Sequence, residues 1–512
     1  MNVEPNTPIL IGCASLTDDG TPASQGRSPY DLIAQAARLA LEDTGAAAAL
    51  SRAIDTVALL RSYADTSHRF ATRLGGSRNG PKSVARRVGI EASRHLYTWN
   101  GGNMPQYLVN QFAEEIARGE TRAALVCGGE ALRTQLGVER AGLDVDWCED
   151  PGGEPELVGD PRRGWNDHED RHGLRAAIAQ YPLYENAIRG KRRATPQAHL
   201  KSTATLMARF SAVAARNPLA TRREGWDAER LATIDADNRW IGYPYPRFMV
   251  SNAFIDQAAA FLVTSVGVAQ ELGIDPSKWV FLHGCADAHD QWFTTERAEL
   301  HASPAMRAAS KQALAMAGKR IDQVDLLDLY SCFPSAVEIA CQELGIREDD
   351  PRGLTVTGGL VYFGGPGNSY VVMSICEMVK QLRARPGQFG LVTANGNWVT
   401  KHSYGVYSTT PFEGTWRRES PATLQAELDR MPLAPFTQTP AGAATVETYT
   451  VMHDRSGPVQ GIVLGRLQAT GERFLANTPS DAATLHDLQV RDSLGRPGQV
   501  VSRDGLNVFT PG

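Results

Sequence analysis

The sequence predicts an α/β protein made of two copies of one unit, followed by a small β-rich tail. Three observations support this fold class. Strand and helix patterns alternate from the N-terminus to about residue 130, which favours a mostly parallel sheet with helices on both faces. Two distant stretches of the chain resemble each other, and such self-similarity indicates a structural repeat. From Pro411 onward, apolar residues instead alternate with period two between turn residues, which is typical of short β-strands.

The elements of the first half follow in order. The pattern predicts a buried strand at residues 8–16 and then an amphipathic helix, which has Pro29 in its first turn and Gly45 after its end, where these residue types are common. Further elements are strands at 54–60, 94–99 and 122–129 and a helix at 104–119. Residues 134–250 interrupt this order because they are rich in charge, tryptophan and proline. We interpret them as an insertion or cap over the sheet.

The second half repeats the first. The segment SPYDLIAQAARLALEDTG followed by IDTVALL matches SPAMRAASKQALAMAGKR followed by IDQVDLL. The glycine pairs Gly101–Gly102 and Gly364–Gly365 each end five residues before a tyrosine and open a helix that leads to a buried strand. Because related loops of a repeat occupy equivalent positions, we expect the two pairs to converge on one site. The predicted domains are residues 1–270 with the insertion at about 134–250, then 271–415, and a β-rich domain at 425–512.

Composition excludes several classes of protein. The chain has 512 residues with 57 acidic and 52 basic side chains, a net charge of −5, which argues against a nucleic-acid partner. The N-terminus lacks the basic region of a signal peptide, and the longest apolar run, 258–263, is too short to span a membrane. The seven cysteines form no CxxC pair. Reduced thiols in the cytoplasm are the expectation.

Several motifs, in this order along the chain, resemble the thiolase superfamily. GGEALRT resembles the family's GGxExMS segment, SNAFIDQAAAFLVTS its SGINDGAAAVVL segment, LYSCF the HDCF form of its NEAF loop, and GGLVYFGGP its GGAIALGHP segment. The resemblance covers residues 8–411. TKHSYGVYSTTP and the β-rich tail resemble one subgroup, the thiolase-like proteins type 1 with an additional C-terminal domain. This resemblance implies a thiolase fold, which consists of two duplicated α/β halves in the layer order αβαβα, with an inserted loop domain and a small β-rich C-terminal domain.

The chain departs from this family at the catalytic positions. The nucleophilic cysteine corresponds to Gly102, the polar residue of the NEAF or HDCF loop to Tyr330, the GHP histidine to Gly365, and the second cysteine to Ala394. Thiolysis and Claisen condensation need a thiolate and a second acid or base, and glycine provides neither. We therefore predict that the usual thiolase reaction is absent.

Three residues remain as catalytic candidates, each with a structural alternative. Tyr330 resembles the tyrosines that transfer protons in superfamily retro-aldolases acting on CoA esters, or it fills space. Cys332 precedes a predicted helix, whose dipole can lower a thiol pKa, or it is a buried inert thiol. His402, beside the last glycine loop, could serve as an acid or base, or it is structural.

The ligand-binding candidates lie in the glycine loops and in the SNAF segment. Backbone N–H groups at helix starts can bind an oxyanion or a carbonyl, although glycines also allow close packing between the halves. Asn252 aligns with the family's CoA-contacting serine. The candidates are Gly101, Gly102, Gly364, Gly365 and Asn252. Basic clusters at 189–193 and 222–223 could contact the phosphates of coenzyme A or form solvated faces.

Residues 168–172 fit the zinc pattern HExxH, but their setting is polar and Gly173 follows at once. A zinc protease carries this motif on an amphipathic helix, so we predict no metal site. His283 and His289 are expected to be structural. The segment Gly365–Gly367 lacks the spacing of a dinucleotide-binding loop.

The sequence therefore predicts a cytoplasmic thiolase-like protein that takes a coenzyme A thioester as substrate or ligand, without a permanently bound cofactor. The reaction would be acyl transfer or a retro-aldol cleavage; the alternative is a non-catalytic protein that binds acyl-CoA or lipid. Thiolases usually pair through an edge strand of the first half, here residues 92–100. A tail docked on that strand would block pairing, and we favour a monomer over a homodimer; docking at the pocket mouth would leave a dimer possible.

Overall fold

The computed structural model describes residues 3–66 and 68–512 of the protein. Within these residues the main sheet has ten strands in the order β10-β11-β12-β9-β1-β8-β4-β2-β3-β5. The strands of the first half are β1 (Pro8–Thr17), β2 (Thr56–Leu59), β3 (Arg94–Thr98), β4 (Ala123–Ala131), β5 (Glu156–Val158) and β8 (Asp256–Ser265). Those of the second half are β9 (Val280–His289), β10 (Leu326–Asp328), β11 (Phe389–Gly396) and β12 (Lys401–Ser408).

The strand order confirms the predicted repeat. Outward from the centre, the first half runs β1-β8-β4-β2 and the second half runs β9-β12-β11-β10. The two copies meet where β1 pairs antiparallel with β9, through Ile9 with Phe281 and Leu10 with Val280. The buried apolar runs of these strands are typical of sheets covered on both faces.

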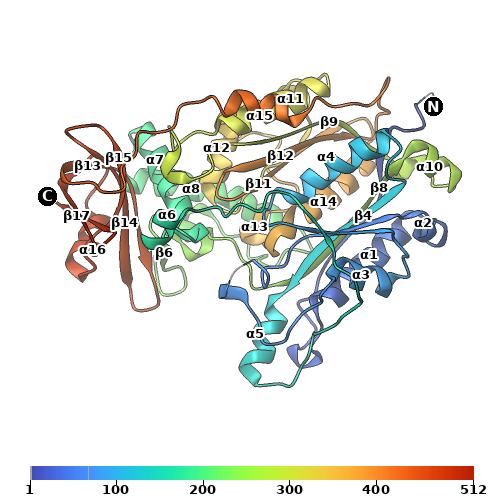
Figure 1. The fold of residues 1–512 in the computed structure, drawn as a ribbon, viewed down its shortest axis with the longest axis horizontal. Coiled ribbons are helices and arrows are strands. Elements are labelled where there is room, and N and C mark those ends of the chain that lie inside the picture. The colour runs from blue at the N-terminus through green and yellow to red at the C-terminus, as the bar shows by residue number, and fades with distance from the viewer. Residues whose placement is uncertain (1–2, 67) are drawn as a thin grey trace.

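The helices repeat in the same way. α1 (Pro29–Asp43) and α11 (Pro304–Met316) each begin with proline after a serine cap, and the hydroxyls of Ser28 and Ser303 accept from backbone N–H groups of the first turn. α4 (Met104–Ala117) and α14 (Tyr370–Ala384) contact each other and strands of both halves. Figure 1 shows these two helices between α11 on one side and α1 on the other, the expected layered order.

The remaining helices cover the first half or belong to the insertion. The first group is α2 (Ala47–Ala53), α3 (Gly80–Val88), α5 (Leu132–Ala141) and α10 (Val266–Glu271). The insertion contains α6 (Asp167–Arg171), α7 (Ala177–Arg192), α8 (Pro196–Ala214) and α9 (Ala228–Ala232). The second half adds α12 (Pro334–Leu344), α13 (Gly359–Tyr362) and α15 (Pro421–Leu428), and the tail adds α16 (Ala482–Val490).

The C-terminal tail forms a second sheet at one end of the molecule (Figure 1). In the described residues this sheet has seven strands, ordered β14-β15-β17-β16-β13-β6-β7. Five belong to the tail: β13 (Gly442–His453), β14 (Pro458–Leu467), β15 (Arg473–Asn477), β16 (Pro497–Arg503) and β17 (Leu506–Pro511). The other two, β6 (Trp240–Gly242) and β7 (Tyr245–Pro246), come from the insertion. The tail therefore docks on the insertion and shares its sheet with it.

Two arginines fasten the tail to the rest of the protein. Arg473 of β15 is fully buried and donates to the carbonyl oxygens of Thr295 and Arg297. Arg189 of α7 makes two hydrogen bonds of 2.8 Å to the carboxylate of Asp492. Bidentate arginine–carboxylate pairs fix orientation as well as distance.

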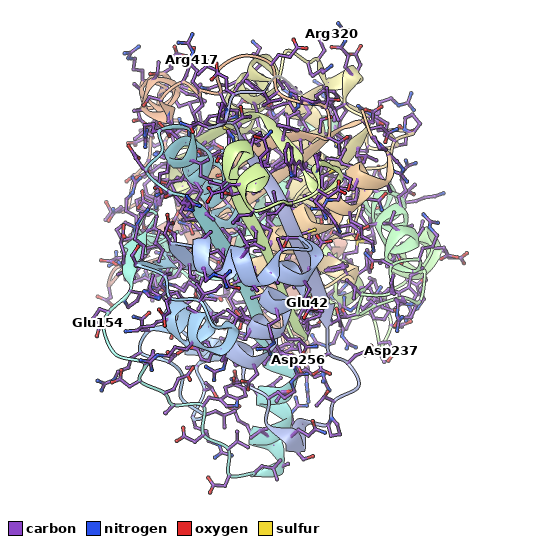
Figure 2. The ribbon with its side chains drawn as sticks, turned by 90° about the vertical axis from the view of Figure 1, so that its right-hand side faces the viewer. Glu42, Glu154, Asp237, Asp256, Arg320 and Arg417 are labelled. Atoms are coloured by element: carbon purple, nitrogen blue, oxygen red, sulfur yellow. The ribbon has the colours of Figure 1, made fainter. Side chains whose placement is uncertain are left out.

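The strand expected to mediate pairing is covered, but not by the tail. β3 pairs on its outer side with β5, through Leu96 with Glu156 and Thr98 with Val158. Glu154, just before β5, is exposed at the surface (Figure 2). An insertion strand thus occupies the edge that residues 92–100 would otherwise present. In the described ranges no helix combines the length and apolar character needed to cross a bilayer.

Candidate functional site

The two glycine loops meet, as the repeat predicts. The N–H of Gly101 donates to Asn368 Oδ1 at 3.0 Å, and Asn368 lies three residues beyond Gly365. The N–H of Gly365 donates to the carbonyl oxygen of Asn252 at 2.8 Å. These two N–H groups already have partners within the protein, so they are not free for an oxyanion as the sequence suggested. Asn252 lies against the second loop through the same bond.

Tyr330 fills the space beside Gly102. A Cβ placed on Gly102 would lie 2.6 Å from the carbonyl oxygen of Asn395 and 2.8 Å from Cζ of Tyr330, and closer still to the Tyr330 hydroxyl. Carbon atoms in ordinary contact are about 3.5–4.0 Å apart, so no side chain fits here. The phenol of Tyr330 thus occupies the place next to the position where thiolases carry their nucleophile.

Tyr330 is held as a neutral phenol. Its N–H donates to Thr393 Oγ1 at 2.9 Å, and its ring packs edge-on against Tyr370 at a centroid distance of 5.9 Å. Burial raises the pKa of Tyr330 well above its ordinary value. Near neutral pH this hydroxyl can donate a proton to a developing negative charge, but it cannot begin as a base.

Gly364 allows a second close approach. Its φ of +136° is in the region that favours glycine, and a Cβ there would lie 2.9 Å from Cδ of Gln257. Gln257 donates through Nε2 to the carbonyl oxygen of Phe363 at 3.0 Å. This glycine therefore serves packing between the second loop and β8.

The thiol of Cys332 is not activated. It lies before Phe333, the cap residue of α12, and is 9% exposed. Burial raises the pKa of Cys332 to about 12. The sequence suggested the opposite direction because Cys332 stands near a helix start. The dipole acts only within the first turn, and burial outweighs both it and the hydrogen bond with Tyr181, which lowers the pKa.

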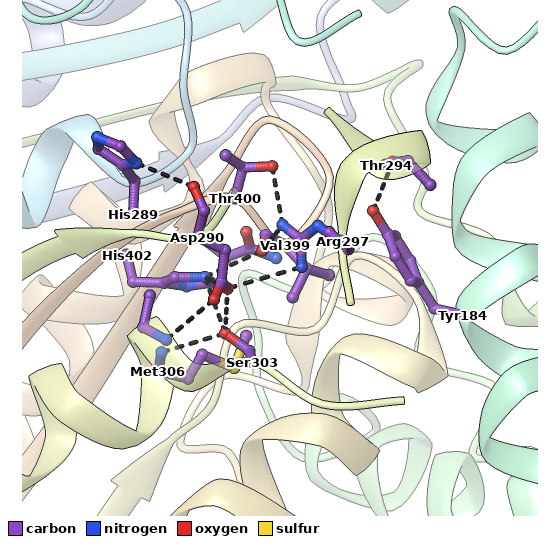
Figure 3. A network of polar contacts seen from close by, with 12 residues as sticks. Tyr184, His289, Asp290, Thr294, Arg297, Ser303, Met306, Val399, Thr400 and His402 are labelled. Atoms are coloured by element: carbon purple, nitrogen blue, oxygen red, sulfur yellow. Dashed lines mark hydrogen bonds and ion pairs between the residues drawn. The ribbon is translucent and has the colours of Figure 1, made fainter. Parts of the chain in front are cut away.

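His402 lies on the opposite face of β12 from the glycine loops. Its Nε2 is 3.1 Å from the carbonyl oxygen of Val399 and 3.4 Å from both Asp290 Oδ2 and Ser303 Oγ (Figure 3). Burial alone would raise the pKa of Asp290, but Arg297 and His402 lower it below its ordinary value. His402 therefore belongs to a buried ionic cluster at the start of α11.

Lys401, the preceding residue, takes the place expected for His402. Its Nζ donates to the carbonyl oxygen of Asn100, and a Cβ on Gly101 would lie 2.9 Å from it. Burial lowers the pKa of Lys401 to about 8, although the Asp160 carboxylate opposes this. Period-two alternation along a strand puts Lys401 and His402 on opposite faces. A charged residue in an otherwise uncharged strand was the signal for Lys401.

Glu130 is a second titratable residue near the site. It lies on β4 in the GGEALRT segment, is 3% exposed, and accepts from the N–H of Tyr63 at 2.7 Å. Burial raises the pKa of Glu130 to about 8. Its carboxyl packs against Gly367 of the second loop and borders a cavity of about 40 Å³. A glutamate inside an apolar strand could have identified it.

Several arginines in the basic clusters of the insertion have partners within the protein. Arg189 binds Asp492, as described above, and Arg192 contacts Glu338 and Glu348. Arg222 donates to the carbonyl oxygen of Val361 at 3.1 Å, and burial lowers its pKa to about 10. The guanidinium groups of Arg189 and Arg222 are thus used within the protein, whereas Lys191, Arg193 and Arg223 are exposed, as expected of a solvated face. Arg223 lies 3.8 Å from Asp19 at the surface.

The HExxH segment does not form a zinc site. His172 uses both ring nitrogens, with Nδ1 2.8 Å from the carbonyl oxygen of His168 and Nε2 accepting from the N–H of Asn507 at 3.0 Å. Glu169 accepts from the N–H of Thr295 at 2.9 Å. The motif instead joins the insertion to the tail.

One other group of described residues has the composition of a cation site. Glu185, His199 and Glu338 bring ligand atoms within 4.8 Å of one another in a fully buried position. His199 Nε2 already bonds Glu185 Oε1 at 2.5 Å, and Arg192 lies 3.4 Å from Glu338 Oε1. The group is therefore an internally paired network that joins α7, α8 and α12.

Comparisons with known proteins identify relatives of this chain. A family model for the additional C-terminal domain of thiolase-like protein type 1 matches residues 423–505. The 3-ketoacyl-CoA thiolase of Klebsiella pneumoniae is 26% identical over 148 residues, 28% of this chain and 35% of the thiolase. The chain thus spans about a third of the length of the curated relatives it matches.

Solved structures extend the likeness to the whole chain. The Ltp2–ChsH2 aldolase covers 80% of this chain and 99% of its own at 20% identity, with a TM-score of 0.56, and at that identity it shows the fold alone. The crystal structure of a monomeric SCP2-thiolase like protein type 1 from Mycobacterium smegmatis is 37% identical and covers 100% of both chains, with a TM-score of 0.85. This chain therefore belongs to the type 1 SCP2-thiolase-like proteins of the thiolase superfamily.

Proposed function

We propose that the protein binds an acyl thioester of coenzyme A where the two glycine loops meet, and cleaves it by retro-aldol chemistry without a covalent cysteine. The carrying observation is the fit between Gly102 and Tyr330, since the place of the nucleophile is closed by a phenol. A retro-aldol reaction of a 3-hydroxyacyl thioester requires proton transfer and stabilisation of an enolate, but no thiolate. The aldolase of the same fold lends support by analogy only.

Each residue has a definite part in this proposal. The neutral hydroxyl of Tyr330 donates to the thioester oxygen as negative charge develops during cleavage. Gly102, whose Cβ position lies against this hydroxyl, supplies a second donor through its N–H. Burial keeps both groups away from water, which strengthens their interaction with the enolate.

A non-catalytic binding protein is the second candidate. The close packing of Tyr330, which is 9% exposed, favours it. A closed polar pocket can hold a ligand without transforming it.

One experiment separates these functions. The purified protein is screened by thermal shift against acetyl-, acetoacetyl- and 3-hydroxyacyl-CoA esters, and the products are analysed by mass spectrometry. Binding to the folded state raises the melting temperature by mass action. Retro-aldol cleavage gives a shorter acyl-CoA and a carbonyl compound, whereas a binding protein returns the ester unchanged. No shift with any ester at millimolar concentration contradicts both candidates, and CoA-dependent thiolysis contradicts the absence of a nucleophile.

We also propose that the protein is a monomer in the cytoplasm. The solved relative of the same family is described as monomeric, and β5 covers the edge through which thiolases usually pair. The seven unpaired cysteines fit a reducing compartment.

A further inference from the structure

The loop between β11 and β12 is strained. Asn397, Trp398 and Val399 follow one another with φ values of 48°, 55° and 64°. A left-handed conformation costs a non-glycine residue about 1–2 kcal/mol. Three in succession are retained only where the surroundings fix them, and such strain is concentrated at functional sites. This turn leads directly into Lys401.

Unpartnered polar atoms gather around the same turn. Asn103 Oδ1, Asn397 Nδ2 and Trp398 Nε1 are buried without a hydrogen-bond partner among the described residues. Asn103 Oδ1 is wedged between the two loops, since a Cβ on Gly396 would lie 2.5 Å from it. Buried polar groups in native proteins are normally bonded, so three exceptions on adjoining loops indicate a place prepared for a polar ligand.

Lys401 is the charged group of this place. It is 5% exposed, and its Nζ has one protein acceptor, the carbonyl oxygen of Asn100. The ring of Trp292 lies 6.0 Å from Nζ. The nearby carboxylate of Asp160 is already bonded to Arg162 at 2.6 Å, so it binds the ammonium only weakly.

We propose that Lys401 is a nucleophile of this site and forms an imine with the ketone or aldehyde that cleavage of a 3-hydroxyacyl thioester releases, or with the 3-keto group of a 3-oxoacyl thioester. The neutral amine adds to the carbonyl carbon, and the carbonyl oxygen takes the proton that nitrogen releases. Loss of this hydroxyl as water gives the C=N bond, and no oxidant or reductant is needed. Tyr330, whose hydroxyl lies against Gly102, is the proton donor for the departing hydroxyl, and its phenolate takes up the second proton that nitrogen releases. The proposal rests on the site of the proposed function and names its reacting residue.

The environment of Lys401 suits this role. An amine reacts only when neutral, and desolvation activates lysines for imine chemistry. With a pKa of about 8, Lys401 is neutral in roughly a tenth of the protein molecules at pH 7, whereas an ordinary lysine is neutral in less than about a thousandth of them. Asp160 and Arg162 are the charged neighbours that act on Nζ, in opposite directions.

The test is reductive trapping of the full-length protein. Acetoacetyl-CoA, or the acetoacetyl thioester of N-acetylcysteamine, is added with sodium cyanoborohydride, and the adduct is located by intact-mass and peptide analysis. We expect one adduct per chain, with the mass of the ligand less one oxygen atom, on Lys401. The rate of adduct formation should rise about tenfold from pH 7 to pH 9 and level off above pH 9, where nearly all Lys401 side chains are neutral. Surface lysines should instead continue to gain about tenfold per pH unit.

The controls separate this inference from the proposed function. Lys401→Arg should abolish the adduct, and Lys311→Met, at an exposed position on α11, should leave it unchanged. Mapping on the wild-type chain decides the matter even if Lys401→Arg unfolds. Adducts spread over surface lysines, or an amide formed by acyl transfer, overturn the inference. A thermal shift with CoA esters but no trapped adduct supports the proposed function and refutes the role of Lys401. Trapping of the short thioester on Lys401 without any thermal shift by CoA esters supports the role of Lys401 and refutes the proposed function.

Discussion

Replacing Gly102 by alanine should destabilise the protein because Tyr330 already occupies the space. The new Cβ would lie 2.6 Å from the Asn395 carbonyl oxygen, which belongs to β11 and cannot move, and 2.8 Å from Tyr330 Cζ. Ordinary contacts are about 3.5–4.0 Å, so the phenol must shift by about 1 Å within a packed interior. Overpacking of this kind costs about 1–3 kcal/mol.

Urea unfolding, followed by tryptophan fluorescence, measures this cost. Gly20→Ala is the matched control, since a Cβ at Gly20 would have no heavy atom of the described residues within 4 Å. In a Tyr330→Ala background the ring is gone, and Gly102→Ala should lose the part of its penalty that the ring causes, a coupling of about 1–2 kcal/mol, while the close contact with the Asn395 carbonyl oxygen remains. If Gly102→Ala is as harmless as Gly20→Ala, or equally costly with and without the ring, the fit between Gly102 and Tyr330 is wrong.

Three further predictions concern pH, the sheet edge and the tail. The pKa of Glu130 in the folded protein, about 8, is raised above its value in the unfolded chain. The contribution of Glu130 to stability is therefore complete below about pH 4.5 and is lost as pH rises through 8, by about 1.4 kcal/mol for each pH unit between these two pKa values. Glu130→Gln should remove this loss, and a pH profile of the melting temperature that the substitution leaves unchanged contradicts the prediction. The carbonyl oxygen of Val158 accepts from the N–H of Trp99 at 2.8 Å, so the N–H of Val158 also faces β3. Val158→Pro should therefore uncover the edge of β3 and yield dimers in light scattering, whereas Leu157→Pro should not. Equal molecular masses for the two variants would refute the covering role of β5. Arg189→Ala removes the bond between Arg189 and Asp492, so it should reduce the stability of the docked tail by about 1–3 kcal/mol. The loss should be seen as faster proteolysis between residues 411 and 441, and resistance equal to that of the wild type would contradict the prediction.

The sequence allowed the fold to be predicted because the repeat is visible in it. The capped helices α1 and α11 and the two glycine loops lie at equivalent positions, and this equivalence decides the layer order. The family, the thiolase fold and the meeting of the loops are confirmed. The C-terminal sheet was seen only in part, because β6 and β7 have three and two residues, too few for any periodicity.

The site was less accessible to sequence reasoning because its chemistry depends on tertiary burial. Cys332 stands near a helix start, but the burial that raises its pKa depends on tertiary packing, with Tyr181 of α7 stacked on the neighbouring Phe333. Choosing between Lys401 and His402 requires knowing which face of β12 meets α4, and both faces of that strand are buried. The left-handed turn at 397–399 has no glycine to mark it.

The shared sheet of tail and insertion also affects how the chain is made. The hairpin of β6 and β7 ends at Pro246, and its partner strand β13 begins at Gly442. Ribosomes add about 5–20 residues per second, so the hairpin waits about 10–40 s for the strand that completes it. During that interval its edge is open to other nascent chains. Slow translation of residues 250–440 should therefore lower the yield of folded protein, and a chaperone that shields the hairpin during synthesis should restore it.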